Sequence, residues 1–173
     1  MKVRELMNSP AYLCRPQDSL ALAAKLMWDH DCGMLPVVDG QGRVGAAITD
    51  RDICMGALTR GRVLAELRVA DSMSTDVITC RGDDDVGIAA QRMAEHRLHR
   101  LPVVDEHGKP VGVISLNDLA LASEQQNAVA KDAMKVLVAA CQHRTTVPAT
   151  AVTPKPAVPI APTKTKGAAT TGS

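Results

Sequence analysis

Two short segments carry the side chains best suited to binding chemistry, Thr49-Asp-Arg-Asp52 and Ser115-Leu-Asn-Asp118. In each, a hydroxyl stands three residues before a carboxylate, at the end of an apolar run that predicts a strand. The residues that follow predict a helix, whose first N–H groups are unpaired and favour an anion. Arg51 can grip a phosphate with two parallel hydrogen bonds. We therefore expect the first segment to bind a charged ligand better than the second, which has Asn117 at that position.

The same spacing also has a purely structural interpretation. Thr-x-x-Asp approximates a capping box, in which the hydroxyl accepts from a backbone N–H of the first helical turn and the carboxylate reaches back to the capping residue. Such a cap stabilises a helix by about 1 kcal/mol. Capping and ligand binding are compatible, and the sequence leaves both open.

Both segments belong to an internal repeat without gaps. Shifting the sequence by 66 positions aligns residues 3–53 with residues 69–119, and a repeat is the strongest single indication of architecture. The run Leu35-Pro-Val-Val-Asp39 recurs whole at positions 101–105. Further identities at this offset are Val3/Val69, Met7/Met73, Cys14/Cys80, Asp18/Asp84, Met27/Met93, His30/His96, Ile48/Ile114 and Asp52/Asp118.

Each copy predicts the order strand, helix, strand, strand, helix. Apolar residues at i, i+3, i+4 and i+7 follow Asp18-Ser19 and Asp84-Asp85 and predict the first helix of each copy, which Gly33 is expected to stop in copy one,. One copy alone leaves too much apolar surface exposed, so we expect a single pseudosymmetric unit of mixed α/β (α+β) class. The expected strands are residues 12–14, 35–38 and 43–48 in copy one and 77–80, 101–104 and 110–114 in copy two,.

The domain boundaries follow from the repeat. We expect domain 1 at residues 1–60, a linker at 61–68 and domain 2 at 69–122. A C-terminal helix is expected at 123–142, and a disordered Pro/Ala/Thr/Lys-rich tail at 143–173,. An apolar stripe on that helix is a candidate surface for a second subunit: Ala130, Met134, Leu137, Val138 and Cys141.

Composition limits the function classes. The chain has 173 residues, no Phe, one Tyr and one Trp, and a net charge of +1. Removing the four cations after Gln142, a stretch without acids, leaves the first 142 residues at −3. Such a body disfavours nucleic-acid binding. Five cysteines without a C-x-x-C pair favour free thiols in a reducing cytosol,. No segment predicts a signal peptide or a membrane span, so we expect a soluble, cytoplasmic protein,.

Two copies that carry LPVVD, a Gly-containing turn and a strand ending in Thr/Ser-x-x-Asp resemble paired CBS domains, the Bateman module. The resemblance covers residues 1 to about 120,. It implies two β-α-β-β-α repeats packed sheet to sheet across a pseudo-two-fold axis, with two clefts for an adenosyl ligand such as AMP, ADP, ATP or S-adenosylmethionine. It further implies a stand-alone regulatory module, not an enzyme, with no required cofactor, a homodimeric state and an unknown downstream protein partner.

The resemblance also assigns ligand contacts. It places the Thr49 and Ser115 hydroxyls on phosphate or ribose, and the carboxylates of Asp52 and Asp118 on the ribose diol. Ala46, where copy two has Gly112, is expected to crowd a ligand in one cleft. Adenine positions are Ala11, Tyr12, Val77 and Ile78, with Met34 and Arg100 before the LPV runs, and Arg100 can add positive charge to either cleft. The full candidate set is Thr49, Asp50, Arg51, Asp52, Ser115, Asn117, Asp118, Tyr12, Val77, Ile78, Arg100 and Pro102.

Other kinds of site are disfavoured. His30, Cys32, His96 and His99 precede the LPVV strands, but a His near a helix end is more often a cap or a dipole partner than a metal ligand,. Cys14 and Cys80 are interpreted as small buried hydrophobes,. We find no ordered catalytic triad, P-loop or Rossmann glycine pattern,. The alternative function is a structural or protein-interaction module whose clefts bind no ligand.

Overall fold

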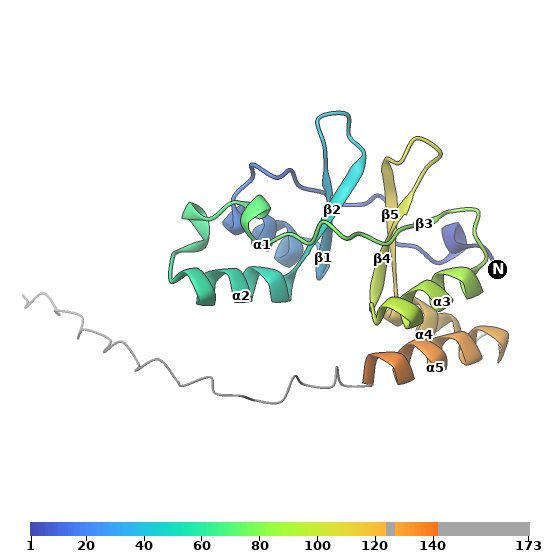
Figure 1. Cartoon of the computed structure of the whole chain (residues 1–173). Helices are drawn as coiled ribbons and strands as arrows, with labels where there is room; N and C mark the ends of the chain where they lie inside the picture. The colour runs from blue at the N-terminus through green and yellow to red at the C-terminus, as the bar shows by residue number, and fades with distance from the viewer. Residues whose placement is uncertain (124–126, 142–173) are drawn as a thin grey trace, which may run out of the picture. The chain divides into compact units, whose positions relative to one another are not determined.

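Two antiparallel hairpins stand side by side at the centre of the molecule (Figure 1). This computed structural model describes residues 1–123 and 127–141. Strands β1 (Met34–Val38) and β2 (Val44–Thr49) form one hairpin, and β4 (Arg100–Val104) and β5 (Pro110–Ser115) form the other. The registers are equivalent, since Leu35 pairs with Ile48 and Leu101 with Ile114. The hairpins also touch, because Val44 N–H donates to the Gly108 oxygen (2.9 Å).

Helices cover the outer side of each hairpin (Figure 1). Helices α1 (Leu20–Asp29) and α2 (Asp50–Arg60) belong to the first repeat, and α3 (Val86–His96) and α4 (Leu116–Ser123) to the second. Each repeat begins with a short 3-10 turn, η1 (Val3–Glu5) in the first and η3 (Val69–Asp71) in the second, and η2 (Leu64–Glu66) lies in the linker. This arrangement confirms the predicted mixed α/β fold built from two equivalent repeats.

The first strand of each repeat is shorter than predicted. In the second repeat it is β3 (Cys80–Arg81), which pairs parallel to β4, and in the first only Cys14 forms a bridge, with Val37. Both cysteines are 1% exposed, which confirms their interpretation as small buried hydrophobes. Burial raises the pKa of each thiol to about 12, so both remain neutral at physiological pH,.

The end of α1 differs from the prediction that Gly33 stops it. The helix ends at Asp29, and Asp31 adopts the left-handed conformation (φ 48°). Cys32 N–H closes the end by donating to the Met27 oxygen (3.0 Å), as in a Schellman motif,. Gly33 has a different role, because a Cβ there would lie 2.9 Å from Asp50 Oδ2 and closer still to Arg100 Nη1.

The N-terminal turn of each repeat packs in the core of the other repeat. Val3 is fully buried in the cluster around α3, β4 and β5, and Val69 is fully buried in the cluster around α1, β1 and β2. The backbone bonds match: Val3 N–H donates to Asp84 O (3.0 Å), and Val69 N–H donates to Asp18 O (2.8 Å). Each core is therefore completed by the N-terminal turn of the other repeat. The predicted domain boundaries assign each turn to the repeat that it begins, and they stay a prediction.

Helix α5 (Asn127–Cys141) packs on α3 and α4. Its buried side chains are Val129, Ala133 and Val136, whereas the predicted stripe contains Met134, Leu137 and Val138, which are exposed. The stripe is therefore not the face on which this helix folds. Its role in contacting a second subunit stays a prediction. Residue 142 of the expected helix and the expected disordered tail at 143–173 lie outside the described residues.

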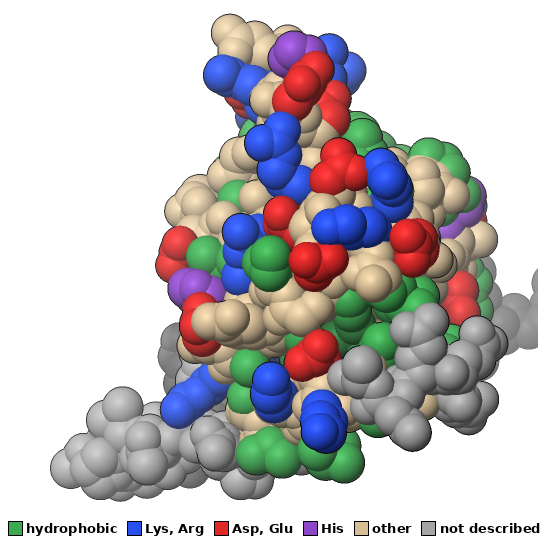
Figure 2. All heavy atoms as spheres, turned by 90° about the vertical axis from the view of Figure 1, so that its right-hand side faces the viewer, with side chains coloured by type: hydrophobic (Ala, Val, Ile, Leu, Met, Phe, Trp, Pro, Cys, Tyr) green, Lys and Arg blue, Asp and Glu red, His purple; other side chains and the backbone are tan. Residues whose placement is uncertain are grey.

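Asp39 and Asp105 order the two hairpin turns. Backbone N–H groups of Arg43 and Gln41 donate to Asp39, and those of Lys109 and His107 donate to Asp105. These bonds lower the pKa of both carboxyls,. Elsewhere on the second repeat, cationic and acidic side chains are interspersed (Figure 2). The visible face is thus unlike the single-sign surface that nucleic-acid binding uses.

Candidate ligand-binding cleft between the repeats

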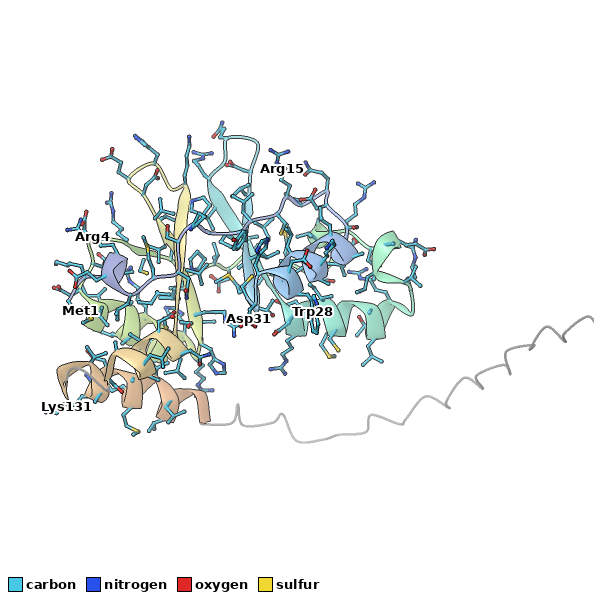
Figure 3. The ribbon with its side chains drawn as sticks, turned by 180° about the vertical axis from the view of Figure 1, so that it is seen from behind. Met1, Arg4, Arg15, Trp28, Asp31 and Lys131 are labelled. Atoms are coloured by element: carbon cyan, nitrogen blue, oxygen red, sulfur yellow. The ribbon has the colours of Figure 1, made fainter. Side chains whose placement is uncertain are left out.

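A cleft of about 280 Å³ is lined by both repeats. Two stretches of the first repeat, residues 8–12 and 30–34, form most of its wall, and the second repeat contributes Arg100 and Val113. Figure 3 shows one lining residue, Asp31, below the lower ends of the central strands. The volume is just below the range for small-molecule sites, about 300–1,000 Å³, and suits a nucleoside-sized ligand.

The wall at residues 8–12 is fixed at both ends. Asn8 exchanges two backbone hydrogen bonds with Val113 of β5 (2.9 and 3.0 Å), and Ser9 Oγ donates to the Val111 oxygen (2.9 Å). At the other end, Cys14 N–H donates to the Pro36 oxygen (3.1 Å) of β1. The segment therefore crosses from the sheet of the second repeat to that of the first, and the cleft lies along this crossing.

Tyr12 and His30 form a stacked pair within this wall. Their ring centroids are 3.5 Å apart and their planes are inclined by 7°. His30 is the C-cap residue of α1 and is held by the closed helix end described above. Because both residues line the cleft, this part of its wall is aromatic.

Arg100 supplies the cationic side of the cleft. Its Nη1 donates to the backbone oxygen of Gly33, so a side chain of the second repeat holds a loop of the first. Within residues 1–123 and 127–141, no carboxylate lies within ion-pair distance of this guanidinium. Its remaining N–H groups are candidates for an anionic or polar ligand group. Nearby, burial raises the pKa of the Cys32 thiol, which keeps that lining group neutral.

Both Thr/Ser-x-x-Asp junctions form complete capping boxes. Asp52 Oδ2 accepts from Thr49 N–H (2.9 Å) and Thr49 Oγ1 (2.7 Å), while Asp52 N–H donates to Thr49 Oγ1 (3.3 Å). Ser115 and Asp118 repeat the pattern, with the carboxylate at 2.7 Å from both donors. The structural interpretation of the spacing is therefore confirmed at both helices.

The second oxygen of each carboxylate differs between the copies. Asp118 Oδ1 accepts from the side-chain amide of Asn8 (3.0 Å). The residue equivalent to Asn8 is Ser74, and no described side chain donates to Asp52 Oδ1. A carboxylate oxygen accepts two bonds, so Asp52 keeps two acceptor positions for a hydroxyl pair and Asp118 keeps one.

The predicted site residues lie on two different sides of the molecule, that of the described cleft and that of its repeat-related equivalent. Tyr12 and Arg100 line the described cleft. Asp118 is joined to that cleft through Asn8, and Ser115 shares a strand face with Val113, two residues earlier,. By repeat equivalence, Thr49 and Asp52 belong with Ser74 on the other side, where Ser74 pairs with Ala47. The remaining predicted residues lie outside the lining: Asp50, Arg51, Asn117, Val77, Ile78 and Pro102.

The expected crowding by Ala46 concerns the cleft on the side of Thr49, not the cleft lined by Tyr12 and Arg100, and it stays a prediction. Ala46 is 3% exposed and belongs to the first core cluster. In copy two, Gly112 has no side chain because Asn8 approaches so closely that a Cβ would lie 2.8 Å from the Asn8 oxygen. The glycine therefore admits the crossing segment. Sequence reasoning missed the roles of Asn8, His30 and Gly33. The only available signal was that Gly33 replaces the His99 of copy two.

Two other kinds of site have less support. A hollow of about 430 Å³ lies beside the first hairpin turn, but its carboxylate, Asp39, is occupied by its own turn and by Arg43. No group of three or more His, Cys, Asp or Glu side chains in the described ranges could hold a metal ion. Among the helices of residues 1–123 and 127–141, none is long and apolar enough to cross a membrane.

The sequence repeat matches a known family. The sequence model of the CBS domain matches residues 3–68 and 64–124. The chain belongs to the CBS domain family. The CBS domain-containing protein YhcV of Bacillus subtilis (strain 168) is 34% identical over 119 residues, which cover 69% of this chain and 83% of that protein. CBS domain pairs of this kind are regulatory modules.

A solved CBS domain pair has a similar fold. That of protein MJ0100, in complex with 5′-methylthioadenosine and S-adenosyl-L-methionine, is 27% identical with a TM-score of 0.65, over 73% of this chain and 98% of that one. The homoserine O-acetyltransferase of Methanocorpusculum labreanum (strain ATCC 43576 / DSM 4855 / Z) is 32% identical over 126 residues. The match covers 73% of this chain but only 25% of that protein, so the activity in its name is not transferred here.

Proposed function

We propose that this CBS domain pair is a sensor that binds an adenosyl ligand in the cleft lined by Tyr12 and Arg100. One observation carries the proposal: a nucleoside-sized cleft joins an aromatic wall from one repeat to the Arg100 guanidinium of the other, which has no ion-pair partner within residues 1–123 and 127–141. Because Arg100 already binds Gly33 across the repeats, a ligand that takes over this guanidinium changes the contact between them. AMP, ADP, ATP and S-adenosylmethionine are the candidate ligands.

The similar MJ0100 pair supports the ligand class, since it was solved with two adenosyl compounds. The charges of the cleft lining narrow the choice among the candidate ligands. The lining holds one cation, Arg100, and one carboxylate, Asp31, and the Asp50 carboxylate lies beside the lining residue Gly33. A ligand with a single phosphate or a zwitterionic tail matches this balance better than a triphosphate does, because like charges across a cleft repel. We expect AMP, 5′-methylthioadenosine or S-adenosylmethionine to bind more tightly than ATP.

The ligand-free alternative has its own support. Both capping boxes are complete without a ligand, so the junctions have a structural role whether or not the cleft is occupied. In that case the module acts only through its surface, and titration with adenosyl compounds detects no heat.

Isothermal calorimetry with AMP, ATP, 5′-methylthioadenosine and S-adenosylmethionine separates the two functions. The matched variant is Arg100→Met, because Met34 is the equivalent residue of copy one. Loss of charge-assisted bonds worth about 1.5–3 kcal/mol is expected to weaken AMP by about 10-fold to 150-fold and to affect 5′-methylthioadenosine far less. Absence of binding by every compound at millimolar concentration would sink the sensor proposal. An equal loss for all ligands would contradict the role given to Arg100.

A sensor also needs an output, and we place it at exposed apolar helix surfaces. Trp28 is 86% exposed and projects from α1 beside α2 (Figure 3), and Leu58 of α2 is 72% exposed. Such side chains favour a homodimer or a downstream protein partner in the cytoplasm. Sedimentation of the wild type and of Trp28→Glu tests this surface. A monomer at all concentrations of the wild type would contradict dimerisation.

A further inference from the structure

We propose that two copies of this chain associate through α5, with the outer stripe of α5 from one copy lying on helices α1 and α2 of the other. The outer stripe consists of Met134, Leu137 and Val138. This inference rests on the part of the proposed function that places the output at exposed apolar helix surfaces, and it names the partner of that surface. The CBS match ends at residue 124, so α5 (Asn127–Cys141) is an addition to the two repeats.

Helix α5 has two apolar faces. Its inner side chains, Val129, Ala133 and Val136, are 4%, 9% and 0% exposed and pack in the core of the second repeat. The side chains of the outer stripe are between 44% and 57% exposed. At 3.6 residues per turn, the two sets together span about 200° of the helix, roughly twice the width that one buried face needs. A helix of this kind is typical of an element that is covered on both faces.

The second repeat shows what its helix face accepts. Helix α5 lies along α3 and α4 there (Figure 1). It approaches α3 so closely that a Cβ on Gly87 would lie 3.2 Å from Asp132 Oδ2. Ala90, one turn further along α3, is fully buried in the same cluster as the inner side chains of α5. This face of a repeat therefore binds an apolar helix.

The equivalent face of the first repeat is open to solvent. Ala24 of α1 corresponds to Ala90 but is only partly buried. Further along the same face, Trp28 stands where the second repeat has Ala94, and it is 86% exposed. Leu58 of the neighbouring helix α2 is 72% exposed. A Trp buries about 150–250 Å² and is enriched among the side chains that dominate interfaces, so this face is suited to a second apolar helix.

A second copy of the chain is the partner that supplies such a helix. Each copy carries both halves of the contact, the open face of α1 and α2 and the outer stripe of α5. A two-fold axis therefore makes the contact twice. This doubling matters because a stable interface buries about 800 Å² on each partner, which is more than the few side chains of one contact supply.

Fluorescence and sedimentation of the full-length chain test the association. Trp28 is the only Trp, so its emission reports on this face alone. We expect the wild type to dimerise as its concentration rises, with Trp28 emission shifting to shorter wavelength over the same range. Leu137→Lys should weaken dimerisation at least about 30-fold and remove the shift, because a charge enters two symmetric contacts. The matched control is Ile88→Lys on α3, since Ile88 is 41% exposed, Leu137 is 44% exposed, and Ile88 lies outside both surfaces. This control should behave as the wild type.

Isotope-filtered NMR of a dimer made from labelled and unlabelled copies identifies the contact itself. We expect cross-peaks between the Trp28 indole of one copy and the Leu137 methyl groups of the other. A monomer at all concentrations, unchanged dimerisation in folded Leu137→Lys, or Trp28 cross-peaks only to α1 of the other copy would overturn the inference. Each of these results leaves adenosyl binding, measured by calorimetry, untouched. Cross-peaks between Trp28 and Leu137 in a protein that binds no adenosyl compound would support the α5 contact and remove the ligand.

Discussion

The exchange of N-terminal turns makes a prediction about where a mutation acts. Val3 is fully buried, but in the core of the second repeat, and its equivalent Val69 is fully buried in the core of the first. Replacing Val3 with Ala removes two buried methyl groups and leaves a small cavity. At about 0.8 kcal/mol per group plus the cavity term, the cost is about 2 kcal/mol. We expect this loss of stability in helix α3 and strand β4, not in α1.

Native-state hydrogen exchange measures the location of this cost. In Val3→Ala, amides of α3 and β4 are expected to exchange about 30-fold faster than in the wild type, since 1.4 kcal/mol corresponds to a factor of ten. Amides of α1 and β1 should change much less. Val69→Ala should give the mirror result, with faster exchange in α1 and β1. The two variants are matched controls for each other, because the residue type and the burial are the same.

One outcome would refute this reasoning directly. If Val3→Ala accelerates exchange in α1, or in both repeats by the same factor, then the turn does not stabilise the opposite core selectively. Mass-resolved peptides that cover residues 20–29 and 86–96 separate these outcomes.

Three further predictions concern stability. Ser72→Ala should raise the free energy of unfolding by about 1 kcal/mol in urea, because its buried hydroxyl has no described partner,; a loss would contradict this. Thr49→Ala and Ser115→Ala should each lower it by about 1 kcal/mol by removing a cap, and a cost at only one site would show that the boxes are not equivalent. Asp39 and Asp105 have folded pKa values below the ordinary 3.8. They stabilise the fold above that pH and lose their contribution as the pH falls through the folded pKa, so replacing both with Asn should flatten the acid limb of stability against pH.

Most of the fold could be predicted because its signals are local and occur twice. The hairpin strands, the helix starts and both capping boxes follow from apolar periodicity and from spacings of three residues. The exchange of turns could not be predicted in this way. Val3 and Val69 are identical and lie in the same local pattern, so either core satisfies either residue equally well. Only the path of the chain decides between them.

The same difference between local and long-range signals applies to the candidate site. The resemblance to CBS domains implies Tyr12 and Arg100 as ligand positions, and the structure brings both to one cleft. The contacts that complete the cleft join residues far apart in sequence, such as Arg100 with Gly33 and Asn8 with Asp118. Gly33 was interpreted as a helix stop because glycine is common there, whereas its position is explained by the guanidinium that crosses beside it. A single sequence does not carry such long-range pairings.

The crossed turns also govern the order of events during synthesis. The first repeat emerges from the ribosome without the residues that close its core, and it must wait for Leu67 and Val69. For the second repeat, the turn that completes its core contains Val3 and has already been synthesised. A polypeptide with a single copy would have no such piece of its own and could complete its core only by trading turns with another molecule. The duplicated chain is in this sense a reciprocal dimer joined into one polypeptide, in which each repeat completes the core of the other.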